Sequence, residues 1–289
     1  MENKALITTE NLTKRFKKLE VVKNLSISFG EGERVALIGQ NGAGKTSLIR
    51  CILGHYIFEG NIQVLEKNPR KERVEILKEV GFVPQIPPPL KMTVGELMDF
   101  YGKLSNTPNE KFIQICEHLG LSVEENKSKP FFKLSGGMKQ KLLVSFAIGK
   151  NPKILLLDEP SANLDPKARE VLFEYLDNFR KDGLMILSSH RLNEISTLVN
   201  RLIEMDLGNI VVDKTMIPQS EKDFVFQYKI RLTETNEELE NLLTNWKFKQ
   251  NSEHLNWEAE IRNKDVAKLS NILNRFTDFI KSIETEKVE

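Results

Sequence analysis

The segment 39–46, Gly-Gln-Asn-Gly-Ala-Gly-Lys-Thr, has the composition and spacing of a loop that binds phosphate groups. Its glycines let the backbone curl so that successive N–H groups point at phosphate oxygens, and the N-terminus of a following helix adds positive potential. We expect Lys45 to reach the β- and γ-phosphates of a nucleotide and the Thr46 hydroxyl to bind Mg²⁺. The other residues of this predicted phosphate site are Gly39, Asn41, Gly42, Ala43, Gly44 and Ser47.

A pair of carboxylates, Asp158 and Glu159, follows the apolar run 153–157. A strand there would deliver Asp158 beside the metal ion. Glu159 would point to the place of an attacking water, which a carboxylate can orient and partly deprotonate. The alternative is a solvated acidic pair that merely ends a strand. Because the phosphate loop lies in the same chain, we favour the catalytic interpretation.

A second candidate anion site is Ser135-Gly136-Gly137, which precedes a helical segment. Ser135 is suited to cap that helix, and the helix N-terminus would offer backbone N–H groups to an anion. An isolated tripeptide of this kind is usually an ordinary helix cap. Together with the loop 39–46, however, it predicts that one chain carries two phosphate-binding surfaces.

The elements that must position these groups are strands separated by helical segments, which predicts an α/β fold with a largely parallel sheet over residues 1–214. Ligands of such sheets bind beyond the carboxyl ends of the strands, where polar residues follow here. Helical periodicity dominates between about 86 and 150, which predicts an inserted helical subdomain. The expected strands are 34–38, 80–83, 153–157 and 184–188, and the expected subdomain helices include 94–104 and 109–119.

Residues 215–289 form a second domain in this interpretation, because glycine is absent after Gly208 and the pattern changes. The βαββαβ order is that of a small ferredoxin-like α+β domain. The hairpin is expected to turn at Asn251-Ser252, and the acidic end 284–289 is expected to fray. The expected elements are a strand at 224–232, a helix at 236–245, a hairpin at 246–262, a helix at 266–276 and a strand at 278–284.

The bulk composition excludes several classes of protein. Forty-two basic and 41 acidic residues leave a net charge of +1, which indicates no preference for nucleic acid or an acidic surface. The two cysteines, Cys51 and Cys116, form no C-x-x-C pair, so a zinc site or disulfide framework is not expected and a reducing cytoplasm fits. No stretch approaches the roughly 20 apolar residues that span a bilayer, so we expect any membrane role to depend on a partner.

The order of these motifs resembles that of the ABC ATPases over about residues 5–214, with Ser135-Gly136-Gly137 in the place of the signature motif. In that family two copies pack head to tail, and the signature of one copy caps the γ-phosphate held by the phosphate loop of the other. The resemblance implies an ATPase that works with ATP and Mg²⁺ as a homodimer, or as a heterodimer with a related ATPase. It also implies a separate transmembrane permease.

Four further residues match functional positions of the family. Gln85 matches the glutamine that contacts Mg²⁺ and the water, and His190 matches the switch histidine that contacts the γ-phosphate. Asp165, in the segment 161–165, matches the loop near the partner's phosphate loop. Phe16 matches the aromatic residue that stacks on adenine, although tyrosine is usual there, and only the hydroxyl is lost.

The segment 86–90, Ile-Pro-Pro-Pro-Leu, departs from the family pattern by its three prolines. Prolines stiffen the backbone, so this segment is either a shaped surface for the permease or a rigid linker between subdomains.

We therefore predict the ATP-hydrolysing subunit of an ABC transporter, bound through its permease to the cytoplasmic face of the membrane. The chain looks most like the ATPases of small two-component exporters, such as drug-efflux or nitrous-oxide-reductase maturation systems. The main alternative is a soluble ABC ATPase that acts on nucleic acid or the ribosome. The absence of a long coiled coil between Lys45 and Ser135, and of a second cassette, argues against it. A P-loop kinase would leave the signature and His190 unexplained.

Overall fold

A computed structural model describes residues 4–190, 192–216, 225–251 and 255–288. The chain divides into two compact units, Met1–Met216 and Ile217–Glu289. None of the described helices is long and apolar enough to cross a membrane.

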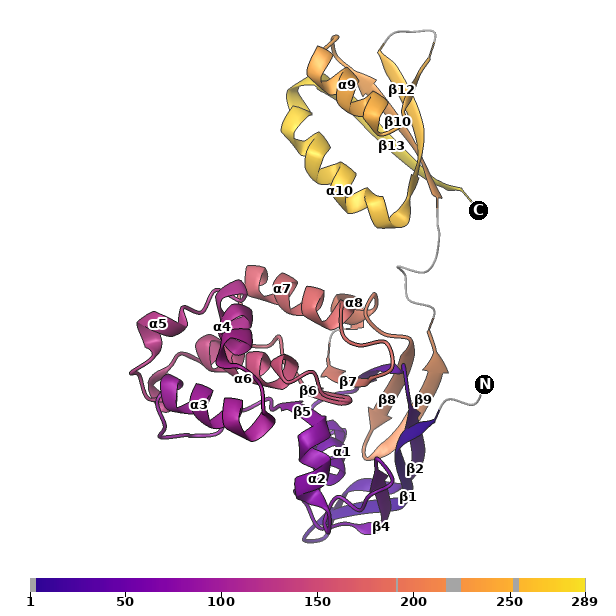
Figure 1. Ribbon diagram of the computed structural model, residues 1–289. Helices are drawn as coiled ribbons and strands as arrows, with labels where there is room; N and C mark the ends of the chain where they lie inside the picture. The colour runs from indigo at the N-terminus through magenta and orange to yellow at the C-terminus, as the bar shows by residue number, and fades with distance from the viewer. Residues whose placement is uncertain (1–3, 191, 217–224, 252–254, 289) are drawn as a thin grey trace. The chain divides into compact units, whose positions relative to one another are not determined.

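The first unit is built on a six-stranded sheet with the strand order β5-β6-β7-β3-β8-β9 (Figure 1). The pairs from β5 to β8 are parallel, and β9 runs antiparallel to β8. Every residue of β6 and β7 is buried, as expected for parallel strands that are covered on both faces. The strands are β3 (Arg34–Ile38), β5 (Val80–Val83), β6 (Ile154–Asp158), β7 (Leu184–Ser189), β8 (Arg201–Asp206) and β9 (Asn209–Thr215).

Successive residues of the central strands face two different hydrophobic cores. Val35 and Leu37 of β3 belong to the core that contains α1 (Lys45–Ile52), whereas Ala36 belongs to the core that contains the helical subdomain. This alternation follows from the two-residue repeat of a strand. The sheet therefore lies between two packed layers, as the sequence predicted for an α/β fold.

The first core is closed by a second sheet that the sequence analysis did not identify. It is antiparallel, with the order β2-β1-β4 formed by Leu19–Gly30, Ala5–Phe16 and Glu59–Val64. The short helix α2 (Arg73–Glu79) then leads into β5. Phe16 is the last residue of β1, so this sheet sets the position of the predicted adenine site.

The predicted helical subdomain contains the two predicted helices almost as expected. They are α3 (Val94–Ser105), which begins with a capping box formed by Thr93 and Glu96, and α4 (Asn109–His118). Figure 1 shows these helices gathered to one side of the sheet. The remaining helices of the first unit are α5 (Val123–Asn126), the 3₁₀ turn Phe131–Lys133, α6 (Gly136–Gly149), α7 (Pro166–Asp177) and α8 (Leu192–Ile195).

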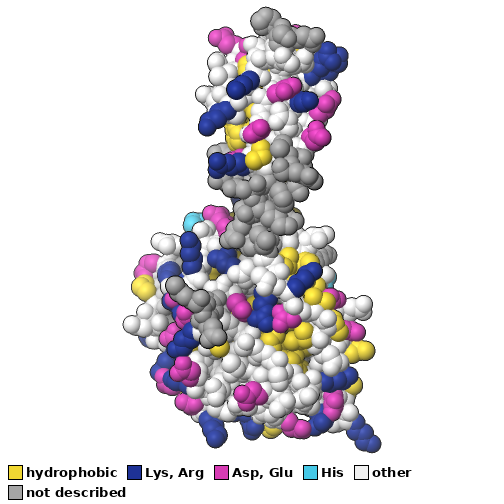
Figure 2. Space-filling model, turned by 90° about the vertical axis from the view of Figure 1, so that its right-hand side faces the viewer, with side chains coloured by type: hydrophobic (Ala, Val, Ile, Leu, Met, Phe, Trp, Pro, Cys, Tyr) yellow, Lys and Arg dark blue, Asp and Glu magenta, His cyan; other side chains and the backbone are white. Residues whose placement is uncertain are grey.

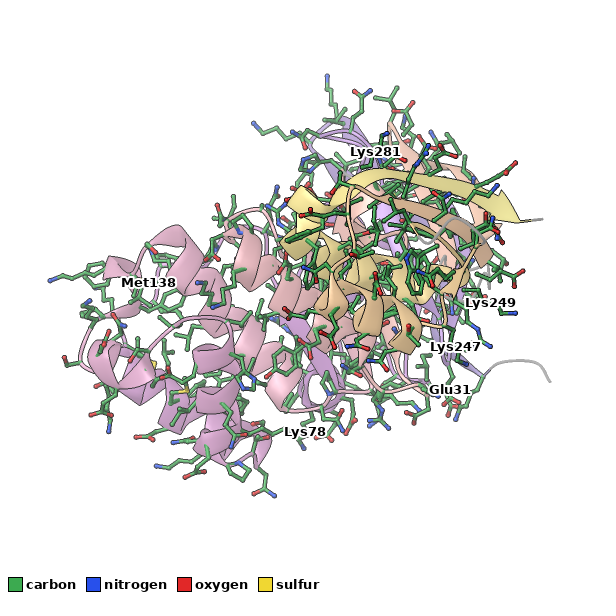
Figure 3. The ribbon with its side chains drawn as sticks, turned by 90° about the horizontal axis from the view of Figure 1, so that it is seen from above. Glu31, Lys78, Met138, Lys247, Lys249 and Lys281 are labelled. Atoms are coloured by element: carbon green, nitrogen blue, oxygen red, sulfur yellow. The ribbon has the colours of Figure 1, made fainter. Side chains whose placement is uncertain are left out.

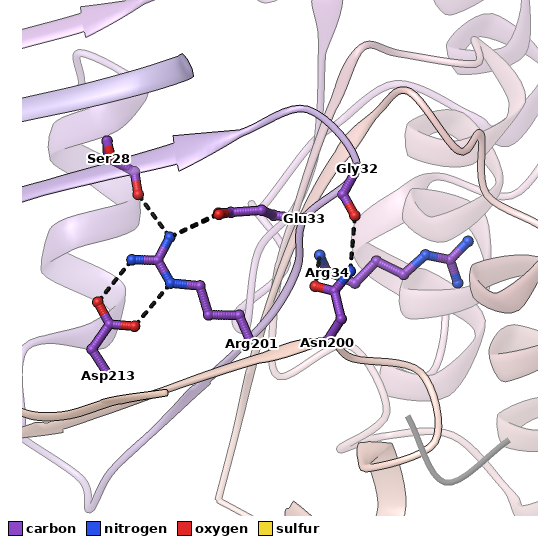
Figure 4. Close-up of polar contacts among 7 residues, drawn as sticks. All are labelled: Ser28, Gly32, Glu33, Arg34, Asn200, Arg201 and Asp213. Carbon is purple, nitrogen blue, oxygen red and sulfur yellow. Dashed lines mark hydrogen bonds and ion pairs between the residues drawn. The ribbon is translucent and has the colours of Figure 1, made fainter. Parts of the chain in front are cut away.

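The amino ends of the parallel strands are tied together by ionic and amide groups (Figure 4). The guanidinium of Arg201 donates to Asp213 at 2.8 and 2.7 Å, to Glu33 at 2.8 and 3.1 Å and to the Ser28 carbonyl at 2.8 Å. Asn200 donates to the Gly32 carbonyl at 3.0 Å. These contacts join β2, β3, β8 and β9 at the edge opposite to the predicted site.

The second unit contains β10 (Val225–Leu232), α9 (Glu237–Asn245), β11 (Lys249–Gln250), β12 (Asn256–Arg262), α10 (Asn263–Leu273), the 3₁₀ turn Asn274–Phe279 and β13 (Ile280–Val288). The sheet order is β11-β12-β10-β13, so the first strand lies between the third and the fourth, as in a ferredoxin-like domain. Both helices contribute leucines to a core against one face of the sheet. The predicted βαββαβ order is therefore correct.

Two local predictions in this unit fall partly on residues outside the described part of the chain. Residues 284–288 of the predicted frayed end belong to β13, which sets Glu284 opposite Lys229 of β10, and Glu289 lies outside the described residues. Of the predicted turn Asn251-Ser252, Ser252 lies outside the described residues. Asn251 closes the hairpin with an N–H bond of 2.9 Å to the Asn256 carbonyl.

Candidate active site

Four strands end at one edge of the six-stranded sheet, and each is followed by a predicted site residue. The register brings Ile38 of β3 level with Ser189 of β7, and Ser188 level with Asp158 of β6, while β5 pairs in parallel with β6. Parallel strands present their carboxyl ends together, so residues distant in sequence meet here. In strand order from β3 to β5 the predicted residues are Gly39, His190, Glu159 and Gln85.

The phosphate loop leads directly into α1, whose first turn contains Lys45 and Thr46. Gly44 has a φ of +109°, and a Cβ there would lie 2.4 Å from the Val21 carbonyl oxygen, so only glycine fits. Asn41 and Gly42 at the loop tip are exposed. The loop is therefore a tightly packed turn with an accessible tip at a helix N-terminus.

Lys45 is held inside its own loop. Its Nζ donates to the carbonyl oxygens of Gly39 at 2.6 Å and Gln40 at 3.1 Å, and the residue is 6% exposed. Burial lowers the pKa of this ammonium, although the nearby carboxylates of Glu159 and Asp158 oppose the shift. Phosphate oxygens would be stronger partners than two neutral carbonyls, because hydrogen bonds between charged groups are the stronger kind.

The acidic pair is fixed by Ser188 of the neighbouring strand. The Ser188 hydroxyl donates to Asp158 Oδ1 at 2.6 Å and accepts the Glu159 N–H at 3.0 Å. Asp158 and Glu159 are 2% and 9% exposed. Glu159 has a φ of +48°, a left-handed conformation that costs a non-glycine residue of order 1–3 kcal/mol. The fold thus turns Glu159 out of the strand direction at the position predicted for the catalytic carboxylate.

His190 lies beside Glu159. Its Nδ1 is 3.3 Å from Glu159 Oε2, and its side chain is 52% exposed. A cavity of about 110 Å³ opens next to this pair. It is large enough to hold water, since a single water needs only about 10–15 Å³ of such volume. The cavity is lined by Glu159, Ser161, Ala162, Arg169, Ser189, His190 and Glu194.

Phe16 is exposed enough to stack on a base, and its ring contacts the side chains of Tyr56 and Lys14. The residue is 43% exposed, and its ring meets Tyr56 edge-on at a centroid distance of 5.2 Å. Lys14 Nζ lies 4.5 Å from the Phe16 centroid and donates to the Ile57 carbonyl at 2.9 Å. A buried cation under one ring face helps to hold this ring in place.

The signature segment lies on a different element from the phosphate loop. Ser135 caps α6 by accepting the Met138 N–H at 3.2 Å, and Ser135 and Gly136 are exposed. Figure 3 labels Met138 among the helices of the subdomain. A Cβ at Gly137 would lie 2.8 Å from the Asn163 carbonyl oxygen, so the signature packs closely on the segment 161–165 of its own chain.

The family resemblance implies that Asp165 lies near the phosphate loop of a second copy. Within this chain its carboxylate is already engaged, because it accepts the Ala168 N–H at 2.9 Å as the cap of α7 and ion-pairs with Lys141 Nζ at 2.8 Å. The Lys141 hydrogen bond is the main cause that lowers the Asp165 pKa. The Asp165 side chain therefore acts first as a structural link between α6 and α7.

Gln85 is half-buried just beyond β5. The next residue, Ile86, is 73% exposed although it is apolar. The proline segment that follows passes to Leu90, which packs against the core of the helical subdomain. The segment therefore combines an exposed apolar start with an anchored end.

Sequence reasoning missed several residues of this edge. Ser188 had a signal, since it is a hydroxyl at the end of an otherwise apolar strand. Gln140 is fully buried and donates to the Pro160 carbonyl at 3.1 Å, and Arg169 ion-pairs with Glu194 at 3.2 Å beside the cavity. Nothing in the spacing of Arg169 and Glu194 indicates that they meet, because one follows β6 and the other follows β7.

The residues present fit a nucleoside triphosphate with Mg²⁺. The loop offers a helix N-terminus and a desolvated lysine to phosphate oxygens. The hydroxyl of Thr46 and the carboxylate of Asp158 are oxygen donors, the type that Mg²⁺ prefers. The glutamine amide oxygen of Gln85 is of the same type. Such a metal would supply charge neutralisation between the β- and γ-phosphates.

Comparison with known proteins agrees with this geometry. The family model described as ABC transporter matches residues 22–162. The ABC transporter ATP-binding protein YxlF of Bacillus subtilis is 33% identical over 211 residues, which cover 71% of this chain and 69% of that protein. The linearmycin resistance ATP-binding protein LnrL of Bacillus subtilis is 30% identical over 213 residues, covering 71% of this chain and 68% of that protein.

Among solved structures, the ADP conformation of MJ1267, an ATP-binding cassette of an ABC transporter, superposes with a TM-score of 0.59. It is 27% identical and covers 73% of this chain and 91% of that chain. An ATP-binding subunit of an ABC transporter has a TM-score of 0.66 at 23% identity, covering 73% of this chain and 90% of that chain, which supports the fold. The chain belongs to the family of ABC transporter ATP-binding proteins.

Proposed function

We propose that two copies of this chain bind MgATP between them and hydrolyse it to drive a separate transmembrane permease. The single observation that carries this proposal is the separation of the two anion sites. Lys45 lies with Asp158, Glu159 and His190 at the sheet edge, whereas Ser135 caps the exposed start of α6. An exposed, capped helix start is available to the nucleotide of a second copy.

In this proposal the chain's own residues divide the work. Lys45 and the N–H groups of 39–46 bind the β- and γ-phosphates, and Phe16 stacks on adenine. Thr46, Asp158 and Gln85 hold Mg²⁺. Glu159 orients the attacking water and accepts its proton, and His190 leaves its contact with Glu159 to reach the γ-phosphate.

In the second copy, Ser135, Gly136 and Gly137 close the site, and Asp165 supports the segment that faces it.

ATP would close the pair of chains, because its γ-phosphate contacts both of them, and hydrolysis would let the pair reopen. This binding energy would move the permease. The exposed Ile86 and the stiff prolines after it support the docking-surface interpretation of 86–90. Through this contact the chain would lie at the cytoplasmic face of the membrane. One relative is named for linearmycin resistance, and another, 29% identical, is named for methionine import. Proteins named for resistance and for import therefore both resemble this chain.

The nucleic-acid alternative gains no support from the second unit. The face of its sheet away from the helices carries a row of alternating charges, because Lys249 faces Glu258, Glu258 faces Lys229 and Lys229 faces Glu284. Figure 2 shows acidic and basic side chains mixed over this unit. A surface that tracks phosphates needs an excess of positive charge, which such a row cancels.

The test is steady-state ATPase activity of the full chain and of Glu159→Gln. The amide keeps the shape of the side chain but cannot accept a proton, so turnover should fall by at least about 100-fold while ATP still binds. Glu66→Gln, which changes a carboxylate that is 72% exposed, is the matched control and should keep full activity. Near-normal turnover in Glu159→Gln would remove this residue from its proposed role.

A further inference from the structure

The sheet of the second unit has two unequal edges. β11 at one edge contains two residues, whereas β13 at the other contains nine and pairs with β10 alone among the described strands. Figure 3 labels Lys249 on β11 and Lys281 on β13. The outer side of a long edge strand presents a row of N–H and C=O groups that can accept another strand.

An apolar side chain marks this edge. Ile283 is 44% exposed, and it is the one large hydrophobic residue of the second unit that is exposed among the described side chains. It lies opposite Ile230, which is 1% exposed, and therefore on the helix-covered face of the sheet. No further described strand lies beside β13 to cover Ile283.

We propose that β13 pairs antiparallel with β13 of a second copy of this chain, with Ile283 on the two-fold axis. Residues directly opposite each other in a sheet share a face, which restricts the register. In this register the two Ile283 side chains meet, and Ser282 faces Glu284 of the second copy. Centring the pair on Glu284 would set two carboxylates opposite each other, and centring it on Ser282 would separate the two isoleucines.

The pairing closes on itself. Each copy uses its long edge, and the two edges that remain are the two-residue strands β11, which are too short to continue the sheet. An eight-stranded sheet therefore forms from two copies without growing into a fibre. The charges of Lys281, Glu284 and Glu286 on β13 also discourage pairing with unrelated strands.

A second copy is the favoured occupant because the ATP site proposed above also needs two copies, and in this respect the inference rests on that proposal. Two chains already joined at one interface meet at the other with a high effective concentration. The second unit would then hold the pair together when ATP is absent. Experiments without nucleotide separate the two ideas, since they do not depend on the ATP site.

The register is tested by disulfide trapping of the full-length Ile283→Cys variant without nucleotide, under mild oxidation. The native thiols Cys51 and Cys116 are both buried and should stay silent. Residues on the axis lie within disulfide reach, so most of the chain should run as a dimer on a non-reducing gel. Glu286→Cys is the control, because its two copies would lie about 20 Å apart at 3.3 Å per residue. Equal trapping at both positions, or none at position 283, overturns the proposal.

Association is tested by sedimentation of the full chain without nucleotide over a range of concentrations. Wild type should associate to a dimer, and Ile283→Lys, which sets two ammonium groups face to face, should stay monomeric with an unchanged circular dichroism spectrum. Val211→Lys is the matched control, since Val211 is 56% exposed on the edge strand β9 of the first unit, and it should dimerise as wild type does. A wild-type monomer at all concentrations, or a dimer of Ile283→Lys as tight as wild type, contradicts the proposal.

Discussion

The six-stranded sheet has an amino edge, where its parallel strands begin, and a carboxyl edge, where they end. Charged groups are paired differently at the two. At the amino edge, Arg201 is surrounded by Asp213 and Glu33, and these contacts raise the pKa of its guanidinium and lower the pKa of Asp213 (Figure 4). At the carboxyl edge, burial lowers the pKa of Lys45, whose hydrogen-bond partners are two neutral carbonyls. At the amino edge the cation has anionic partners within the chain. At the carboxyl edge Lys45 has no anionic hydrogen-bond partner among the described residues.

This difference separates stability from function. Charges that are paired within a chain depend on each other, because removing one partner leaves the other uncompensated, and they offer little to a ligand. A desolvated cation beside a glycine loop and a residue held at a φ of +48° are costly in the free chain, and we expect the phosphates of a nucleotide to compensate the cation. Substitutions at the two edges should therefore divide into those that change unfolding and those that change ATP binding.

The largest effect on unfolding is expected for Arg201→Gln. Removing the guanidinium leaves Glu33 and Asp213 without their main partner, and partial exposure of these carboxylates reduces the loss to about 2 kcal/mol in the free energy of unfolding. Urea titration followed by circular dichroism measures it, and ATP affinity should be unchanged. An unfolding curve equal to that of wild type would show that the amino edge does not carry the stability assigned to it.

The opposite pattern is expected for Lys45→Ala. Loss of a charge-assisted contact with the β- and γ-phosphates should weaken ATP binding at least about tenfold in isothermal titration. The urea midpoint should stay close to that of wild type, because the removed ammonium was desolvated and bonded only to carbonyls. Equal ATP affinity in the variant and in wild type would refute the phosphate-loop assignment.

The smallest expected effect is a pH dependence at the amino edge. The folded-state pKa of Asp213 is depressed, mainly by its hydrogen bond with Arg201, so its stabilisation is present above the unfolded-state pKa of about 3.9 and is lost as the pH falls through the folded value. Asp213→Asn should lower the urea midpoint at pH 6, and the difference from wild type should shrink at pH 3. The same pH dependence in an Arg201→Gln background would argue against this cause.

Much of the first unit could be predicted because its strands are short apolar runs that end in chemically recognisable residues. Ile154–Asp158 and the loop 39–46 are examples of that kind. The antiparallel sheet of β1, β2 and β4 escaped prediction, since the long strands Ala5–Phe16 and Leu19–Gly30 mix charged and apolar residues and carry several register shifts.

Contacts between segments that are distant in sequence were harder to predict. The pairs Lys141–Asp165 and Arg169–Glu194 depend on the packing of α7 against its neighbours, which no local pattern encodes. The end of the chain was mistaken for a frayed tail because its acidic residues indicate solvent exposure. Within β13, Glu284 and Glu286 alternate with Ile283 and Thr285, and Glu284 faces Lys229 across the sheet.

The central claim is that each ATP site takes its phosphate loop from one chain and its signature from the other. ATPase activity of two purified mixed dimers tests it most directly. The first joins a Lys45→Ala chain to a Ser135→Arg chain, and the second joins wild type to a chain that carries both changes. If sites are shared, the first dimer keeps one intact site and the second keeps none, so activity should appear in the first and be nearly absent from the second. The reverse result, with activity in the second dimer and none in the first, would contradict the account.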